Sequence, residues 1–209
     1  MSDDGSLIFL LDVSTDEAVE AELLCEVQEC HINDWMGLWQ PAMAKIRAEL
    51  TARGIAKEKL PQSGHWNWAR KIDEVDGLLD FRSFCITLNK VTQGLMRTDI
   101  SQISQVGRID GQKGKPLVYV DYLEAAPWNC SYHGSPVLYR GIGTALITAA
   151  IGLSLKEGYK GRIGLHSLPQ SNDFYAKLGM TDLGPDAKCQ NLRYFEMTPE
   201  QAKDCLGEE

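Results

Sequence analysis

The spacing of hydrophobic residues changes about one third of the way along the chain. Before that point apolar residues recur mostly at helical intervals: residues 16–30 alternate acids with Ala, Val and Leu, and residues 41–53 and 65–75 continue at similar spacing. The continuously apolar residues 7–13 are the exception and are typical of a strand. We therefore expect residues 1–75 to be mainly helical.

From Phe81 onwards strands and helices alternate. Ser167 and Gln170 form a potential capping box before a helix that Gly179 ends, and Thr198 with Gln201 forms another. Such alternation predicts a mixed sheet with helices on both faces. The expected strands are 81–88, 91–98, 117–126, 162–166 and 191–197, and the expected helices are 141–157, 168–178 and a short tail helix from 198.

Composition and charge narrow the class of protein. The chain has 209 residues, of which 44% are hydrophobic and 24% charged, as in ordinary globular proteins. No apolar run is long enough for a membrane helix, and the chain begins with acidic rather than basic residues, so we expect a cytoplasmic protein with reduced cysteines. A net charge of −8 argues against a general nucleic-acid-binding protein.

The segment from Tyr139 to Leu146, Tyr-Arg-Gly-Ile-Gly-Thr-Ala-Leu, carries the clearest chemical signal. Gly141 and Gly143 lack a Cβ, so the backbone can approach a ligand closely at the start of the predicted helix. The first N–H groups of a helix have no internal acceptors and the helix dipole favours anions there. A pyrophosphate fits such a site, and Thr144 offers a hydroxyl.

Two common phosphate-binding motifs do not fit. A Rossmann fingerprint needs a third glycine, where this chain has Leu146, and a loop of 13 residues (127–139) separates the preceding strand from the turn. Residues 111–116 have the wrong spacing for a Walker A loop. If the Gly-x-Gly sequence at residues 141–143 binds no ligand, the alternative interpretation is that these glycines make the start of the helix flexible.

Two motifs together resemble one family. Gly-Ile-Gly-Thr-Ala-Leu-Ile from Gly141, running on to Tyr159, is similar to the acetyl-CoA pyrophosphate loop and helix of the GCN5-related N-acetyltransferases. Phe-Tyr-Ala-Lys-Leu-Gly-Met from Phe174 resembles a later helix of that family, and the order and separation also match. The resemblance covers roughly residues 81–197.

The resemblance implies the GNAT fold, a mixed and mostly antiparallel central sheet flanked by helices, in a single domain over residues 1–209. Residues 81–197 would be the acetyl-CoA-binding core and 198–209 a tail. Acetyl-CoA would be the co-substrate, with no metal. The expected cofactor-binding residues are Ala125, Ala126, Tyr139, Arg140, Gly141, Ile142, Gly143 and Thr144.

Two positions depart from the family pattern. Leu138 stands where the family usually has Gln or Arg, although Arg140, Gly143 and Ala145 match in a shifted register. Leu168 stands where an Asn often contacts the cofactor, with Ser167 and Asn172 as possible substitutes. Both leucines favour an alternative function, a non-catalytic CoA-binding or protein-interaction module with the same fold.

Glu124 lies near the end of the strand before the loop and is the first candidate for a general base. An amine acceptor is mostly protonated at neutral pH, and a carboxylate whose pKa is raised by burial can accept its proton. The alternative role is a structural carboxylate at the strand end. Asp121 and His166 are further candidates, and both are also typical of structural hydrogen bonds.

Tyr175 matches the tyrosine that, in the resembled family, protonates the departing CoA thiolate. A phenol with a pKa near about 10 suits a thiolate whose acid has a pKa near about 8.5. The structural alternative is a core tyrosine on an amphipathic helix. The resemblance therefore implies direct transfer of an acetyl group to a primary amine of a small molecule or protein.

The other aromatic and thiol residues have mainly structural interpretations. Trp35 and Trp39, one helical turn apart, fit a core, whereas Trp128 is the best aromatic candidate for substrate contact. Cys130 and His133 form a weak candidate for a thiol hydrolase, which would require a fixed pair and an orienting third group. No spacing of His and Cys is typical of a zinc site.

Overall fold

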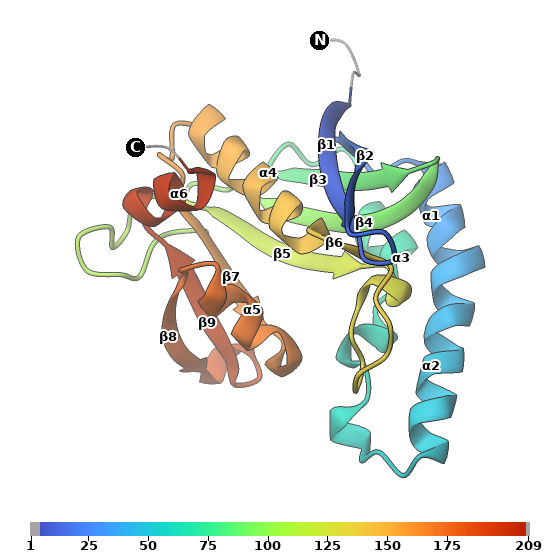
Figure 1. Ribbon diagram of the computed structural model, residues 1–209. Coiled ribbons are helices and arrows are strands. Elements are labelled where there is room, and N and C mark those ends of the chain that lie inside the picture. The colour runs from blue at the N-terminus through green and yellow to red at the C-terminus, as the bar shows by residue number, and fades with distance from the viewer. Residues whose placement is uncertain (1–4, 208–209) are drawn as a thin grey trace. The chain divides into compact units, whose positions relative to one another are not determined.

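A computed structural model of the chain describes residues 5–207, and the acidic residues at the start lie outside this range. Contacts between residues divide the chain into two compact units, and Figure 1 labels the helices and strands of both. The first comprises residues 5–77, 83–96 and 123–146, and the second residues 78–82, 97–122 and 147–207. The units are not consecutive pieces of sequence, and the expected single domain stays a prediction.

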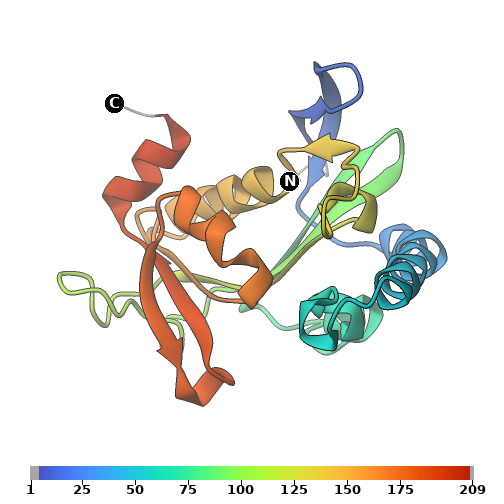
Figure 2. The same ribbon diagram turned by 60° about the horizontal axis from the view of Figure 1, so that its bottom comes forward.

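The first unit is built on antiparallel strands in the order β6-β1-β2-β3-β4. Helices α1–α3 lie on one face of these strands and the start of α4 on the other (Figure 2). A π-helical turn, Trp35–Trp39, joins α1 to α2. The elements are β1 (Ser6–Asp12), β2 (Glu17–Leu24), α1 (Glu29–Asp34), α2 (Gln40–Ala52), α3 (Trp68–Asp73), β3 (Phe81–Leu88), β4 (Val91–Asp99), β6 (Tyr139–Arg140) and α4 (Ile142–Lys156), with β3, β4 and α4 continuing into the second unit.

The second unit contains the order β5-β7-β9-β8, in which β5 and β7 are parallel and the other pairs antiparallel. The register of β5 with β7 covers only Val118–Val120 against Ile163–Leu165, although β5 runs on to Ala125 in the first unit. The elements are β5 (Val118–Ala125), β7 (Ile163–Ser167), α5 (Asn172–Lys177), β8 (Thr181–Asp186), β9 (Leu192–Met197) and α6 (Pro199–Leu206).

The predicted helix over residues 16–30 is wrong. These residues begin with β2, which pairs along its length with β1. Val19, Ala21 and Leu23 turn inward at strand spacing while Glu20 and Glu22 are exposed, so the sequence satisfies both periodicities. The apolar strand β1 decides between them, because pairing with it satisfies the backbone hydrogen bonds of these residues as a strand and overrides helix propensity. Residues 5–75 are therefore a hairpin followed by helices.

Most elements after residue 81 are confirmed, with three differences. The expected helix 168–178 is a 3₁₀ turn, Pro169–Ser171, followed by the shorter α5. Its predicted capping box is wrong, since Ser167 Oγ donates to the Leu168 carbonyl. Strands β6 and β8 were not predicted, since β6 has two residues and β8 contains Gly184 and Pro185. The tail capping box at Thr198 is confirmed.

Within the described residues, no helix is both long and apolar enough to cross a membrane. The core of the first unit contains the fully buried Trp39 and Trp68, and that of the second Ile163 and Phe195. The prediction that Trp35 and Trp39 are core residues is confirmed, with 6% and 1% of their surface exposed.

The first turn of α4 packs directly on β4 at Gly94. A Cβ at this glycine would lie 2.5 Å from Ile142 Cγ2 and 3.2 Å from Leu146 Cδ1. Real Cβ contacts are not this short, so only glycine permits the helix to approach so closely. The position of the α4 N-terminus therefore depends on glycine, the residue without a side chain, at position 94 of the neighbouring strand.

We expect Gly94→Ala to lower the free energy of unfolding by roughly 1–3 kcal/mol, because the methyl group forces α4 away from β4. Chemical denaturation measures this loss. Gly152→Ala in the middle of α4 is the control, since nothing lies within 4 Å of its added Cβ. Equal stability of the Gly94 variant and the unmodified protein would contradict the packing described here.

Candidate active site

Glu124 is a buried carboxylate near the end of β5. Only 8% of the residue is exposed, and its Oε2 accepts a hydrogen bond of 2.6 Å from Trp68 Nε1. Burial raises the pKa of Glu124 from 4.5 to about 7, against the lowering effects of hydrogen bonds from Ser63 and Trp68 and of the Lys71 charge. The carboxyl group therefore changes charge near neutral pH.

The helices before β3 supply the groups that hold Glu124. Trp68 is the first residue of α3 and is completely buried, and the side chain of the N-cap Asn67 accepts a hydrogen bond of 2.9 Å from Arg70 N. Ser63, in the 3₁₀ turn Gln62–His65, is also buried. The sequence pointed to Trp66 and Trp68 as possible walls of an acceptor pocket, but nothing in it indicated that Trp68 would meet a carboxylate 56 positions later.

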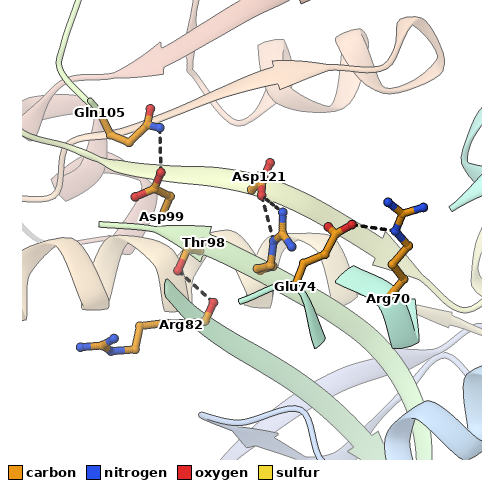
Figure 3. A network of polar contacts seen from close by, with 8 residues as sticks. Arg70, Glu74, Arg82, Thr98, Asp99, Gln105 and Asp121 are labelled. Carbon is orange, nitrogen blue, oxygen red and sulfur yellow. Dashed lines mark hydrogen bonds and ion pairs between the residues drawn. The ribbon is translucent and has the colours of Figure 1, made fainter. Parts of the chain in front are cut away.

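The other two candidate bases are both held by neighbouring side chains. Asp121 accepts a hydrogen bond of 2.8 Å from Arg97 Nε, and the dashed lines to its carboxylate appear in Figure 3. The Arg97 guanidinium also stacks on Phe81 and Tyr122. His166 Nδ1 lies 2.6 Å from Tyr119 Oη, and its Nε2 lies 3.1 Å from Asp186 Oδ2. Both ring nitrogens of His166 are thus engaged by neighbouring side chains.

The predicted phosphate-binding turn begins at β6 and leads into α4. β6 is fixed by pairing with β1 and by Asn129 Oδ1, which accepts a hydrogen bond of 3.0 Å from Tyr139 N. Gly141 follows with a φ of 100°, a conformation that favours glycine. The chain thus turns sharply from a short strand into a helix of 15 residues.

The start of α4 leaves donors for a ligand. Ala145 N donates to the Gly141 carbonyl in the first hydrogen bond of this helix, at 2.8 Å. The N–H groups of Ile142, Gly143 and Thr144 therefore have no acceptor within the helix. Ile142 is buried, whereas Gly141 and Thr144 are exposed, so part of the turn remains accessible. Exposed backbone donors at a helix N-terminus favour an anion.

Ala126, predicted to pair with a cofactor, already uses both of its backbone groups. Its N–H donates to the Gln93 carbonyl at 2.9 Å, and its carbonyl accepts a hydrogen bond of 2.8 Å from Asn129 N. Ala125 carries only a weak contact of 3.8 Å from Cys130 Sγ to its carbonyl among the bonds outside the strands. Both backbone groups of Ala126 are therefore already engaged within the protein.

The loop over residues 127–139 is organised by Gln93, which sequence reasoning missed. Gln93 Oε1 accepts hydrogen bonds of 2.9 Å from both Trp128 Nε1 and Asn129 Nδ2. The Trp128 ring also meets Trp39 edge to face at 6.4 Å between centroids. Trp128, predicted to contact a substrate, therefore has a structural role in fixing the loop.

The weak candidate for a thiol hydrolase lacks its essential pair. His133 Nε2 lies 2.9 Å from the Lys59 carbonyl, where it is hydrogen-bonded to backbone. Burial raises the pKa of Cys130 to about 11, so the thiol stays protonated at neutral pH. A protonated thiol without a histidine partner is a poor nucleophile, which argues against this chemistry.

Tyr175 lies on α5 in the second unit, where 7% of the residue is exposed. Its ring packs against Phe174 and Phe195, with centroids 5.0 Å and 5.7 Å away. Burial raises the pKa of Tyr175, so the hydroxyl remains protonated throughout the neutral range. The buried position of Tyr175 is compatible with both interpretations, a core residue and a proton donor whose hydroxyl is protonated at neutral pH.

Asn172, the first residue of α5, carries an unsatisfied acceptor. Its Oδ1 is the single buried side-chain nitrogen or oxygen without a hydrogen-bond partner within residues 5–207. Such atoms are uncommon because burial without a partner is costly. A ligand that donates an N–H group would satisfy it. Ser167, the other suggested substitute for Leu168, already donates its hydroxyl to a backbone carbonyl.

Comparisons with known proteins identify the fold. No protein-family model matches the sequence, and no curated protein does. The solved PaiA N-acetyltransferase from Thermoplasma acidophilum, in complex with coenzyme A, has a TM-score of 0.53 at 14% identity over 86% of this chain and 99% of that one. Aminoglycoside acetyltransferase AAC(6')-Ib, in complex with coenzyme A and kanamycin, has a TM-score of 0.51 at 16% identity over 88% and 97%.

An uncharacterized protein from Bacillus halodurans is similar over 98% of this chain and 96% of its own, with a TM-score of 0.54 at 8% identity. At these identities the comparisons show the fold alone. The chain has the mixed, mostly antiparallel sheet flanked by helices of the GCN5-related N-acetyltransferases. The predicted fold class is confirmed.

We expect Glu124→Gln to stabilise the protein above pH 7. A pKa raised from 4.5 to about 7 means that the folded protein must bury a charge at high pH, which costs roughly 3 kcal/mol. Below the unfolded value the carboxyl is neutral in both states and the cost disappears. The amide is neutral at every pH and can still accept from Trp68.

The free energy of unfolding, measured by chemical denaturation, should therefore favour the variant at pH 8 and not at pH 4. Glu49→Gln on α2, where the side chain is exposed, is the matched control and should show no such dependence. A difference between Glu124→Gln and the unmodified protein that does not change with pH would contradict the raised pKa.

Proposed function

We propose that the protein is an acetyl-CoA-dependent N-acetyltransferase that moves an acetyl group directly to a primary amine. The observation that carries the proposal is the turn at Gly141 into α4, with helix N–H groups that have no internal acceptors. The fold supports it, because PaiA N-acetyltransferase and AAC(6')-Ib share this fold and were both solved with coenzyme A.

The donor would be held by backbone groups and one side chain. The pyrophosphate would accept hydrogen bonds from the N–H groups at the start of α4, with the Thr144 hydroxyl as a further donor. Ala125 would pair with the pantetheine arm, as the resemblance implies. Tyr139 and Arg140 border the same turn. The bound cofactor supplies an activated acetyl thioester.

Glu124 would act as the general base toward the acceptor. The amine nitrogen attacks the thioester carbonyl carbon, the carbon–sulfur bond breaks, and the amine proton passes to the Glu124 carboxylate directly or through water. A pKa of about 7 makes this carboxyl a stronger base than an ordinary glutamate while leaving much of it ionised at neutral pH. Trp68 restricts it to one orientation.

Tyr175 would return a proton to the leaving sulfur. Its hydroxyl is protonated at every relevant pH because burial raises its pKa. The same burial weakens it as an acid, so donation would have to accompany cleavage of the carbon–sulfur bond and not follow an independent ionisation. The acceptor would be a primary amine on a small molecule or a protein, and AAC(6')-Ib, solved with kanamycin, is an example of the first type.

The alternative is a non-catalytic module that binds CoA or a protein. Leu138, which is half exposed, and Leu168 occupy positions that are usually polar in the resembled family. Turnover distinguishes the two functions: release of free CoA thiol in the presence of a panel of primary amines supports the enzyme, whereas CoA binding without thiol release for any amine supports the module.

We expect acetyl-CoA at millimolar concentration to raise the melting temperature, because a ligand of the native state stabilises it. Gly143→Val should abolish this shift, since its side chain occupies the space that the pyrophosphate needs. Gly152→Val makes the same change later in α4, where nothing lies within 4 Å of the added Cβ, and should keep the shift. Equal shifts in both variants would place the phosphate site elsewhere.

We expect Tyr175→Phe to lower kcat by roughly 10- to 1,000-fold, because the ring and its packing remain while the proton is lost. Affinity for CoA should change little. The kcat and the apparent affinity for acetyl-CoA are both measured by the same thiol-release assay, with the acetyl-CoA concentration varied. A normal kcat would remove Tyr175 from the chemistry and leave it as a core residue.

Glu124→Gln should have a different pH profile. In the unmodified enzyme the rate should rise with pH and level off above about pH 7, where the carboxylate is formed. The variant depends on free amine, so its deficit should be largest at or below pH 7 and shrink toward the pKa of the amine. A deficit of constant size from pH 6 to 9 would show that Glu124 is not the base.

A further inference from the structure

Three side chains of the second unit bring a nitrogen, an oxygen and a sulfur ligand together. His166 lies on β7, Asp186 ends β8, and Cys189 ends the 3₁₀ turn Ala187–Cys189. One potential ligand atom from each lies within 4.8 Å of the other two. The His166 and Asp186 side chains are only 6% and 15% exposed, and Cys189 is partly buried.

The backbone builds this cluster. Asp186 caps the 3₁₀ turn, where its Oδ1 accepts a hydrogen bond of 2.9 Å from Lys188 N. The turn thus begins at Asp186 and ends at Cys189, and the potential ligand atoms of these two residues lie within 4.8 Å of each other. Gln190 and Asn191, with φ of 55° and 58°, then reverse the chain into β9. Strand pairing of β7 and β8 with β9 supplies His166 from the other side.

We propose that His166, Asp186 and Cys189 bind one divalent zinc ion. Imidazole, carboxylate and thiolate are the ligands that zinc uses, and a water molecule would complete four-coordination. With zinc–ligand bonds of about 2.0–2.1 Å, tetrahedral nitrogen and oxygen ligands lie roughly 3.3 Å apart. His166 Nε2 and Asp186 Oδ2 are 3.1 Å apart and need to separate only slightly.

Surrounding residues orient the proposed ligands. Tyr119 Oη lies 2.6 Å from His166 Nδ1 and fixes the imidazole ring, as partners of metal-binding histidines commonly do. Arg108 Nη1 lies 2.6 Å from Asp186 Oδ2 and would remain on that carboxylate. The zinc ion, thiolate and carboxylate sum to zero charge, so the half-exposed guanidinium would face a neutral site and not a net cation.

Zinc binding would replace one hydrogen bond and one thiol S–H bond by bonds to the ion. The hydrogen bond between His166 Nε2 and Asp186 would give way to bonds from both groups to zinc. The imidazole proton would then sit on Nδ1 and be donated to Tyr119 Oη. Cys189 would lose its thiol proton to solvent as the zinc–sulfur bond forms, so each ion releases one proton. No oxidant or reductant is required.

The test uses the chelator-treated full chain titrated with Zn²⁺, and with Co²⁺ as a spectroscopic probe. We expect one ion per chain and, with Co²⁺, a thiolate-to-cobalt charge-transfer band. Cys189→Ser should abolish the band, whereas Cys205→Ser, which removes a cysteine of similar exposure, should retain it. Tyr119→Phe should weaken Zn²⁺ binding by roughly 10- to 100-fold, because the imidazole loses its orienting partner.

A second measurement needs no variant. Alkylation of Cys189 in the unmodified protein, followed by mass spectrometry of its peptide, should slow when Zn²⁺ is added, while alkylation of Cys205 should not. A missing charge-transfer band, a band that persists in Cys189→Ser, or alkylation of Cys189 unaffected by Zn²⁺ would each overturn the proposal. None of these results depends on acetyl transfer.

Discussion

The hydrogen bond from Trp68 to Glu124 joins the helical segment before β3 to the strand that carries the candidate base. A carboxyl group that is nine-tenths buried is tolerated only where neighbours satisfy it, and here an indole N–H at 2.6 Å and the Ser63 hydroxyl do so. These contacts do not fully offset the desolvation, so the pKa stays near 7. The helices before β3 therefore set the charge state of Glu124.

A second constraint fixes the phosphate-binding turn without any charge. Gly94 lets the first turn of α4 approach β4, and Gln93 beside it holds Trp128 and Asn129 of the loop that leads to β6. Two consecutive residues of one strand thus position both the loop before the helix and the helix itself. Exposed backbone donors at the start of α4 are useful to a ligand only because this packing makes their position definite.

The sequence predicted the elements after residue 81 well, because there local periodicity and long-range pairing agree. It failed at residues 17–24, where an acidic, Ala- and Leu-rich segment has high helix propensity and only its partner β1 makes it a strand. The candidate site likewise contains one part that a local motif predicts and one part that depends on contacts between distant residues. Gly141 and Gly143 form a local motif, whereas the partners of Glu124 come from residues about 60 positions earlier, and no pattern in a single sequence reports such a meeting.

If Glu124 is the base, as proposed, the choice of acceptor amine would be coupled to the basicity of this carboxylate. Trp68, Ser63 and Lys71 come from the same short stretch of chain, and each changes the stability of the Glu124 carboxylate. A substitution there that altered which amine is accepted would also alter the pKa of the base. The proposed pyrophosphate turn has no such link, because its donors are backbone groups whose placement depends on Gly94 and Gln93. Donor binding can thus stay constant while the helical region changes, provided that a buried donor continues to face Glu124.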